Sequence, residues 1–192
     1  MPRSLAAHAA HLLTGTRVLM TPAFVSAIAC ADHRPRCGIA AAVLFVVAAA
    51  SDIVDGRVAR RYGSASNAGR TFDHLADITF ILAALSTYTA LGIAPWWVPG
   101  AVGSSFAFYV VDSWTRAPGA TPILLGSWVG HLAGIFNYAV IGIVVFNETA
   151  GIHLLPPTVL ELVFGLVPIY SGAAVLTRLS GRRLVLSLPD AA

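Results

Sequence analysis

The chain has 192 residues, of which 57% are hydrophobic and only 11% are charged, with a mean hydropathy of +0.76. Soluble domains carry about 25% charged residues, so this composition excludes an ordinary soluble protein and indicates a membrane protein. The formal net charge of +3 forms no basic stripe, so it does not predict nucleic-acid binding and instead suits contact with anionic lipid head groups.

Apolar segments separated by short polar turns predict an all-α, polytopic membrane helix bundle. The expected spans are 11–30, 38–60, 69–92, 98–114, 123–146 and 158–176. A chain of this length has room for about six transmembrane helices of roughly 20 residues each. Arg3 could mark a signal peptide, but the apolar run that follows lacks a clear small-residue cleavage site. We therefore expect a single domain over residues 1–192, with an uncleaved first span.

The only cysteines, Cys30 and Cys37, flank the polar turn 31–36 between the first two spans. They could pair in an oxidising compartment, which would require a close turn geometry. Cysteines at span ends more often serve plain packing, and we favour that interpretation over a disulfide.

Four of the nine acidic residues lie at the ends of the second and third spans, at Asp52, Asp55, Asp73 and Asp77. The first two are three residues apart and the last two are four apart, so each pair shares one helical face. If residues 61–68 form a tight turn, the two faces meet across antiparallel helices. Charge is costly in apolar surroundings, so converging carboxylates indicate a bound cation.

The residues around these carboxylates favour a pyrophosphate site. Hard carboxylate oxygens in this number suit Mg²⁺ or Mn²⁺, and we expect two ions. Gly56, Ala59 and Gly69 would let a ligand approach the helices closely. Guanidinium groups, which match phosphate geometry, are available from Arg57, Arg60, Arg61 and Arg70.

The residues from Asp52 to Arg60 read Asp-x-x-Asp-Gly-x-x-Ala-Arg, and those from Gly69 to Asp77 read Gly-x-x-x-Asp-x-x-x-Asp. With eight residues between the two halves, this pattern resembles the signature of the CDP-alcohol phosphatidyltransferase family of integral membrane enzymes. The motif covers a small part of the chain, and the rest is similar in its number of apolar spans. The resemblance implies phospholipid biosynthesis, in which a phosphatidyl group passes from CDP-diacylglycerol to a small polar alcohol and CMP is released.

The resemblance also implies roles for individual residues. Asp52, Asp55, Asp73 and Asp77 would hold the metal, and Asp77 would accept the proton of the acceptor hydroxyl as the catalytic base. The residues expected to contact the CDP-lipid are Gly56, Ala59, Arg60, Ser66 and Gly69. For Ser66, which lies in a polar turn, simple exposure to solvent is the alternative.

The acceptor stays open among glycerol 3-phosphate, inositol phosphate and another polar alcohol. Members that use glycerol 3-phosphate often carry Pro and Lys where this chain has His74 and Ile78. A phosphorylated acceptor would need cations near Asp77, and the candidates are Arg70, Arg116 and Arg17. Arg17 could instead snorkel to the nearer interface, and Arg116 could be an ordinary positively charged flank.

Two further features have more than one interpretation. His131 and Asn137 lie about two turns apart in the fifth span and could face a pocket or form hydrogen bonds between helices. The small residues of the spans would permit a homodimer, but they could equally serve packing within one bundle.

Most arginines fall on the side of the bundle that holds the termini and the aspartates, while Arg34 and Arg36 fall on the other side. The positive-inside rule therefore predicts a multi-pass protein of the plasma membrane with the active site and both termini in the cytoplasm. The alternative function is a transporter or ion-conducting bundle that uses the aspartates for cation passage. It predicts carboxylates at mid-depth and repeat symmetry, whereas these carboxylates lie at span ends and no repeat is evident.

Overall fold

The computed structural model describes residues 3–62, 67–116, 128–153 and 155–184, and within them the side chains of 15–54, 69, 71–116, 128–153 and 155–180. The helices are α1 (Arg3–Cys30), α2 (Pro35–Tyr62), α3 (Asn67–Ala90), α4 (Trp97–Arg116), α5 (Trp128–Val144) and α6 (Pro157–Leu184). A π-helical segment, η1 (Val145–Thr149), continues α5. No strand occurs in these described ranges, which confirms the predicted all-α bundle.

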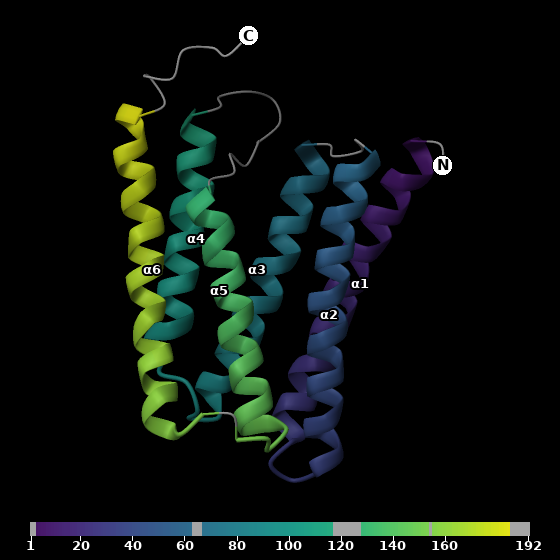
Figure 1. The fold of residues 1–192 in the computed structure, drawn as a ribbon, viewed down its shortest axis with the longest axis vertical. Helices are drawn as coiled ribbons and strands as arrows, with labels where there is room; N and C mark the ends of the chain where they lie inside the picture. The colour runs from purple at the N-terminus through teal and green to yellow at the C-terminus, as the bar shows by residue number, and fades with distance from the viewer. Residues whose placement is uncertain (1–2, 63–66, 117–127, 154, 185–192) are drawn as a thin grey trace.

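The helices run side by side along the long axis of the molecule (Figure 1). α1 packs against α2 and α3, while α4 and α5 both pack against α6. α3 also contacts α4 and α5, so it joins the two groups of helices. α1 begins and α6 ends at the same end of the bundle, which is also the end where α2 finishes and α3 starts (Figure 1).

The outer surface of the bundle is suited to lipid. Within the described chain, three helices are long and apolar enough to cross a membrane, at Pro35–Val54, Trp128–Thr149 and Pro157–Ser180, and Gly15–Cys30 forms a shorter apolar helix. Leu19 and Leu162 expose 79% and 70% of their surface. A soluble bundle would bury such side chains, whereas hydrocarbon accommodates them. The protein is therefore a polytopic membrane protein.

The observed helices extend beyond most of the predicted spans. α1 starts at Arg3 instead of residue 11, and α6 runs to Leu184 instead of ending near residue 176. Polar residues prolong these helices past their apolar parts, where hydropathy gives no signal. α3 ends close to its predicted limit because Gly92 adopts φ +73°, a left-handed conformation that suits glycine after a helix. The predicted start of the fifth span at residue 123 lies outside the described residues.

Aromatic rings pack the centre of the bundle beside the acidic residues. Phe24 of α1 stacks on Phe80 of α3 with ring centroids 4.8 Å apart, and Phe80 stacks on Tyr138 of α5 at 5.9 Å. Gly142 of α5 lies so close to Phe45 of α2 that an added Cβ would be 2.9 Å from the ring. These contacts fix α1, α2 and α5 around α3, which sets the rotation of each helix.

Cys30 and Cys37 form a disulfide across the turn between α1 and α2, so the interpretation that favoured plain packing was wrong. α1 ends at Cys30 and α2 begins at Pro35, and this short connection brings the two Cα atoms to 5.8 Å. That distance lies within the range that disulfides require. The turn lies at the end of the bundle opposite to the start of α1 (Figure 1).

Candidate active site

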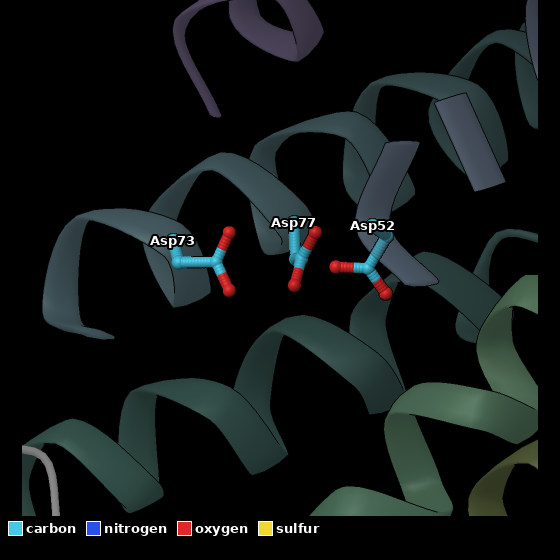
Figure 2. Close-up of side chains that lie close together, drawn as sticks. All are labelled: Asp52, Asp73 and Asp77. Atoms are coloured by element: carbon cyan, nitrogen blue, oxygen red, sulfur yellow. The ribbon is translucent and has the colours of Figure 1, made fainter. Parts of the chain in front are cut away.

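Three aspartates from two neighbouring helices converge in the structure. Asp52 comes from α2, while Asp73 and Asp77 lie one turn apart on α3. One carboxylate oxygen from each aspartate lies within 4.8 Å of those of the other two. Figure 2 shows Asp77 between Asp73 and Asp52, whose carboxylates point toward it. The structure thus brings together three of the four aspartates that the sequence singled out.

The other residues of the motif are placed by their backbone alone. Asp55 lies in α2 within one turn of Asp52, but its side chain falls outside the described part of the chain. Gly56, Ala59 and Arg60 in α2 and Arg70 in α3 are likewise described by their backbone only. Gly69 lies in the first turn of α3, and Ser66 lies outside the described residues. The binding roles expected for these residues therefore stay predictions.

The carboxylates lie where the apolar part of the bundle ends. The apolar stretch of α2 runs from Pro35 to Val54 and includes Asp52 in its last turn. α2 then continues to Tyr62, about ten residues or roughly 15 Å beyond Asp52 along the helix axis. The site therefore lies near one end of this apolar span and not at its centre, which is unlike the mid-depth carboxylates expected of a cation pathway.

Arg17 of α1 reaches into the acidic cluster, and its side chain is fully buried. Its Nη2 donates to Asp52 Oδ1 at 3.1 Å, and its Nη1 lies 3.4 Å from Asp73 Oδ1. Nη1 also donates to Asp77 Oδ1. Snorkelling to the interface, one of the two interpretations of Arg17, does not occur, because the aspartates offer this guanidinium opposite charge inside the bundle. Its alternative role as a ligand of the acceptor phosphate stays a prediction.

Asp77 has a second partner on α5. The hydroxyl of Tyr138 donates to Asp77 Oδ1 at 3.1 Å. With both contacts, Asp77 has the least exposed carboxylate side chain of the three, at 22% against 33% for Asp73 and 36% for Asp52. Sequence reasoning missed Tyr138, although its spacing of two turns from His131 places both on one face of α5.

A cavity of about 660 Å³ opens beside the aspartates, with walls formed by α2, α3, α4, α5 and α6. Its polar lining residues include Asp52, His74, Asp77, Tyr109, His131 and Arg178. Its volume falls in the range of small-molecule sites, and a mostly apolar wall with a few polar groups is typical of them. Neither Arg17 nor Arg116, two candidates for the acceptor phosphate, belongs to the lining.

Arg178 of α6 is a cavity-lining cation that sequence reasoning did not single out. Its Nη1 donates to Asp112 Oδ2 at 3.2 Å, and its guanidinium carbon lies 4.1 Å from the centroid of the Tyr109 ring. Arg116 donates from Nε to the other oxygen of Asp112 at 2.9 Å and from Nη2 to the Arg178 carbonyl at 2.7 Å. These contacts join α4 to α6 and fix Arg178 at the cavity wall. The two interpretations of Arg116, as a candidate for the acceptor phosphate and as an ordinary positively charged flank, are not tested by them.

Both polar residues of α5 that the sequence left open line the cavity. Asn137 also accepts a hydrogen bond from the hydroxyl of Tyr170 on α6. Its pocket-facing and interhelical interpretations therefore both apply. For His131, the cavity-facing interpretation agrees with the structure.

The residues present fit a divalent cation. Three carboxylates from two helices supply the hard oxygen donors that Mg²⁺ and Mn²⁺ prefer. A guanidinium already lies among these oxygens, which shows that their arrangement accepts positive charge. Asp55 lies three residues after Asp52 in α2, and its side chain falls outside the described part of the chain. Its role as a fourth ligand and the binding of two ions therefore stay predictions.

Comparison with known proteins agrees with this geometry. The sequence model of the CDP-alcohol phosphatidyltransferase family matches residues 7–170, which include all the aspartates of the motif. A protein named "Probable phosphatidylglycerophosphate synthase" from Mycobacterium tuberculosis is 31% identical over 162 residues, which cover 79% of this chain and 72% of the relative. The CDP-diacylglycerol–glycerol-3-phosphate 3-phosphatidyltransferase of Bacillus subtilis is 38% identical over 64 residues, 33% of each chain. Since the family match extends from α1 into α6, the chain belongs to the CDP-alcohol phosphatidyltransferase family.

Proposed function

We propose that the protein transfers the phosphatidyl group of CDP-diacylglycerol to glycerol 3-phosphate, with the help of a divalent metal ion. Family membership supports a transferase over the cation-passage alternative. The name of the Bacillus subtilis relative specifies glycerol 3-phosphate as that protein's acceptor. The observation that carries the proposal is the convergence of three carboxylates at the wall of a cavity that also holds Arg178.

The transfer is a displacement at the lipid-side phosphorus of the diphosphate. The acceptor hydroxyl oxygen forms a new bond to this phosphorus, the bond to the bridging oxygen breaks, and CMP leaves with its electron pair. Asp77 accepts the hydroxyl proton, because its carboxylate lines the cavity and Tyr138 holds one of its oxygens. A divalent ion bound to the aspartates would neutralise the negative charge of the diphosphate.

Arg178 supplies the positive charge for the phosphate of the acceptor. Guanidinium groups bind phosphate oxygens through paired N–H donors, which suits a residue fixed at a cavity wall. Its contacts with Asp112 and Tyr109 hold the guanidinium in place before the acceptor arrives. The acceptor would then extend between Asp77, which takes the hydroxyl proton, and Arg178, which binds the phosphate.

We also propose that the aspartate end of the bundle faces the cytoplasm. The disulfide lies at the opposite end, and disulfides persist in oxidising compartments outside the cytoplasm. In a Cys30→Ser/Cys37→Ser background, a membrane-impermeant maleimide should label His33→Cys in intact cells. It should label Asn67→Cys, at the start of α3, only after lysis. The reverse pattern would overturn this orientation.

The acceptor is tested with purified protein, CDP-diacylglycerol and a panel of alcohols. We expect CMP release with glycerol 3-phosphate to exceed that with glycerol, inositol, inositol 1-phosphate and serine, and phosphatidylglycerophosphate to be the product by mass spectrometry. EDTA should stop the reaction, and Mg²⁺ or Mn²⁺ should restore it. Preference for another alcohol would disprove the acceptor, and full activity after exhaustive EDTA treatment would disprove the metal requirement.

A further inference from the structure

Arg17 gives the acidic site a positive charge that belongs to the protein itself. Its side chain is fully buried, and its two terminal nitrogens reach Oδ1 of all three aspartates. It comes from α1, a helix that packs against α2 and α3, and none of the α1 side chains that the structure describes, from Gly15 to Cys30, belongs to the cavity wall. Arg17 therefore approaches the carboxylates from within the α1–α2–α3 group and not through the substrate cavity.

Arg17 is also firmly anchored through its own helix. One turn further along α1, the Thr21 hydroxyl donates to the Arg17 carbonyl oxygen at 2.9 Å. Phe24, about two turns from Arg17, stacks on Phe80 of α3. The ring stack holds α1 beside α3, so release of the guanidinium from the aspartates would be a movement of the Arg17 side chain and not of the helix.

The guanidinium and a metal ion would need the same atoms. Mg²⁺ requires oxygen ligands at about 2.0–2.1 Å, and the guanidinium already contacts one oxygen of each aspartate. Two cations that share three carboxylates would repel each other strongly in a poorly screened site. We propose that Arg17 and the divalent ion exclude one another at Asp52, Asp73 and Asp77, an inference that rests on the metal dependence proposed above.

This exclusion gives Arg17 a role in the metal-free protein. Three carboxylates within 4.8 Å of one another repel, and without a cation they would move apart or take up protons. Arg17 keeps them assembled until an ion arrives. Because its contacts must be given up when the ion binds, Arg17 also weakens the observed metal affinity, as linkage between two competing cations requires.

The test is a Mn²⁺ titration of purified protein followed by electron paramagnetic resonance. Arg17→Met removes the guanidinium and keeps an aliphatic side chain of similar reach. We expect this variant to bind Mn²⁺ at least tenfold more tightly than wild type, a difference that corresponds to about 1.4 kcal/mol. Arg34→Met is the matched control, because Arg34 is exposed beside the disulfide turn and its loss changes the net charge equally. Its Kd for Mn²⁺ should equal that of wild type.

Thermal unfolding provides a second readout that does not depend on catalysis. In EDTA, Arg17→Met should unfold at a lower temperature than wild type, and saturating Mn²⁺ should raise its Tm by more than it raises that of wild type. If Arg17→Met folds only when Mn²⁺ is present, the ion has replaced the guanidinium, which supports the proposal. Arg17→Gln, which is neutral but polar, should then show the tighter binding in a folded protein.

Two different failures can be told apart. If wild type binds Mn²⁺ and Asp52→Asn abolishes that binding, the metal site stands, and an unchanged or weaker affinity in both Arg17 variants overturns mutual exclusion. If neither wild type nor the Arg17 variants bind Mn²⁺, or if binding is indifferent to Asp52→Asn, the metal site itself is overturned and the inference falls with it.

Discussion

Replacing Arg178 by methionine tests which arginine receives the phosphate of the acceptor. Arg178 and Arg116 both bind the carboxylate of Asp112, but only Arg178 lines the cavity that contains Asp77. Methionine keeps an aliphatic side chain and removes the guanidinium. We expect the KM for glycerol 3-phosphate to rise much more in Arg178→Met than in Arg116→Met, which keeps the Arg178 guanidinium and loses only the contacts with Asp112 and the Arg178 carbonyl.

The size of the effect follows from the kind of contact that is lost. A hydrogen bond to a charged group contributes about 1.5–3 kcal/mol. Loss of one such contact to the acceptor phosphate should therefore lower kcat/KM for glycerol 3-phosphate by about tenfold to a hundredfold. Asp112 is nearly fully buried and loses one arginine partner in either variant, so Arg116→Met serves as the control for disturbing Asp112.

The assay measures CMP release against glycerol 3-phosphate concentration at saturating CDP-diacylglycerol, with folding checked by size-exclusion chromatography. The KM for CDP-diacylglycerol should stay the same, because Arg178 is assigned to the acceptor alone. An unchanged KM for glycerol 3-phosphate in folded Arg178→Met would refute the assignment. An equal increase in Arg116→Met would show that the effect comes from disturbing Asp112 and not from the cavity.

Three further changes test the roles of other residues. Asp77→Asn should abolish CMP release because the amide cannot accept the hydroxyl proton, while CDP-diacylglycerol binding partly survives; retained turnover would remove Asp77 from the base role. Tyr138→Phe should lower kcat roughly tenfold by removing a hydrogen bond of about 1.5 kcal/mol to the carboxylate of Asp77, while the ring stack on Phe80 keeps the protein folded. An unchanged kcat would show that Asp77 needs no support from α5. Cys30→Ser/Cys37→Ser should reduce the free energy of unfolding by about 2 kcal/mol. CMP release should stay intact, because the disulfide lies at the end of the bundle opposite to the aspartates, and loss of activity in the folded variant would contradict that separation.

The acidic site could be predicted from the sequence because helical geometry fixes its parts. Asp73 and Asp77 are four residues apart, so any helix through them presents both carboxylates on one face. Because the connection between α2 and α3 is short, the two helices are neighbours, and the face that carries Asp73 and Asp77 meets the face that carries Asp52. Both constraints are local in the sequence. Hydropathy added the positions of the membrane-spanning segments.

Arg17 was among the cations considered near Asp77, but its direct contacts with the aspartates and the contact of Tyr138 could not be predicted, because both depend on long-range packing. Arg17 and Tyr138 lie 60 and 61 positions from Asp77 in the sequence. Which face of α1 or α5 meets α3 is decided by the stacking of Phe24 and Tyr138 on Phe80, and apolar helices carry little sequence signal for such rotation. The disulfide was missed for a similar reason, since the approach of Cys30 to Cys37 depends on how the turn closes.

The structure shows where the two positions lie at which this chain departs from family members that use glycerol 3-phosphate. His74 and Ile78, which replace the Pro and Lys often found there, both line the cavity. A lysine at position 78 would place a positive charge on the α3 wall, one residue after Asp77. In this protein that wall is apolar at position 78, and Arg178 supplies a cation from the α6 wall of the same cavity. The departure therefore does not argue against a phosphorylated acceptor, because the charge that such an acceptor requires is present on a different helix. With the proposed acceptor, its phosphate would lie nearer to α4 and α6, where Tyr109 and Asp112 hold the guanidinium.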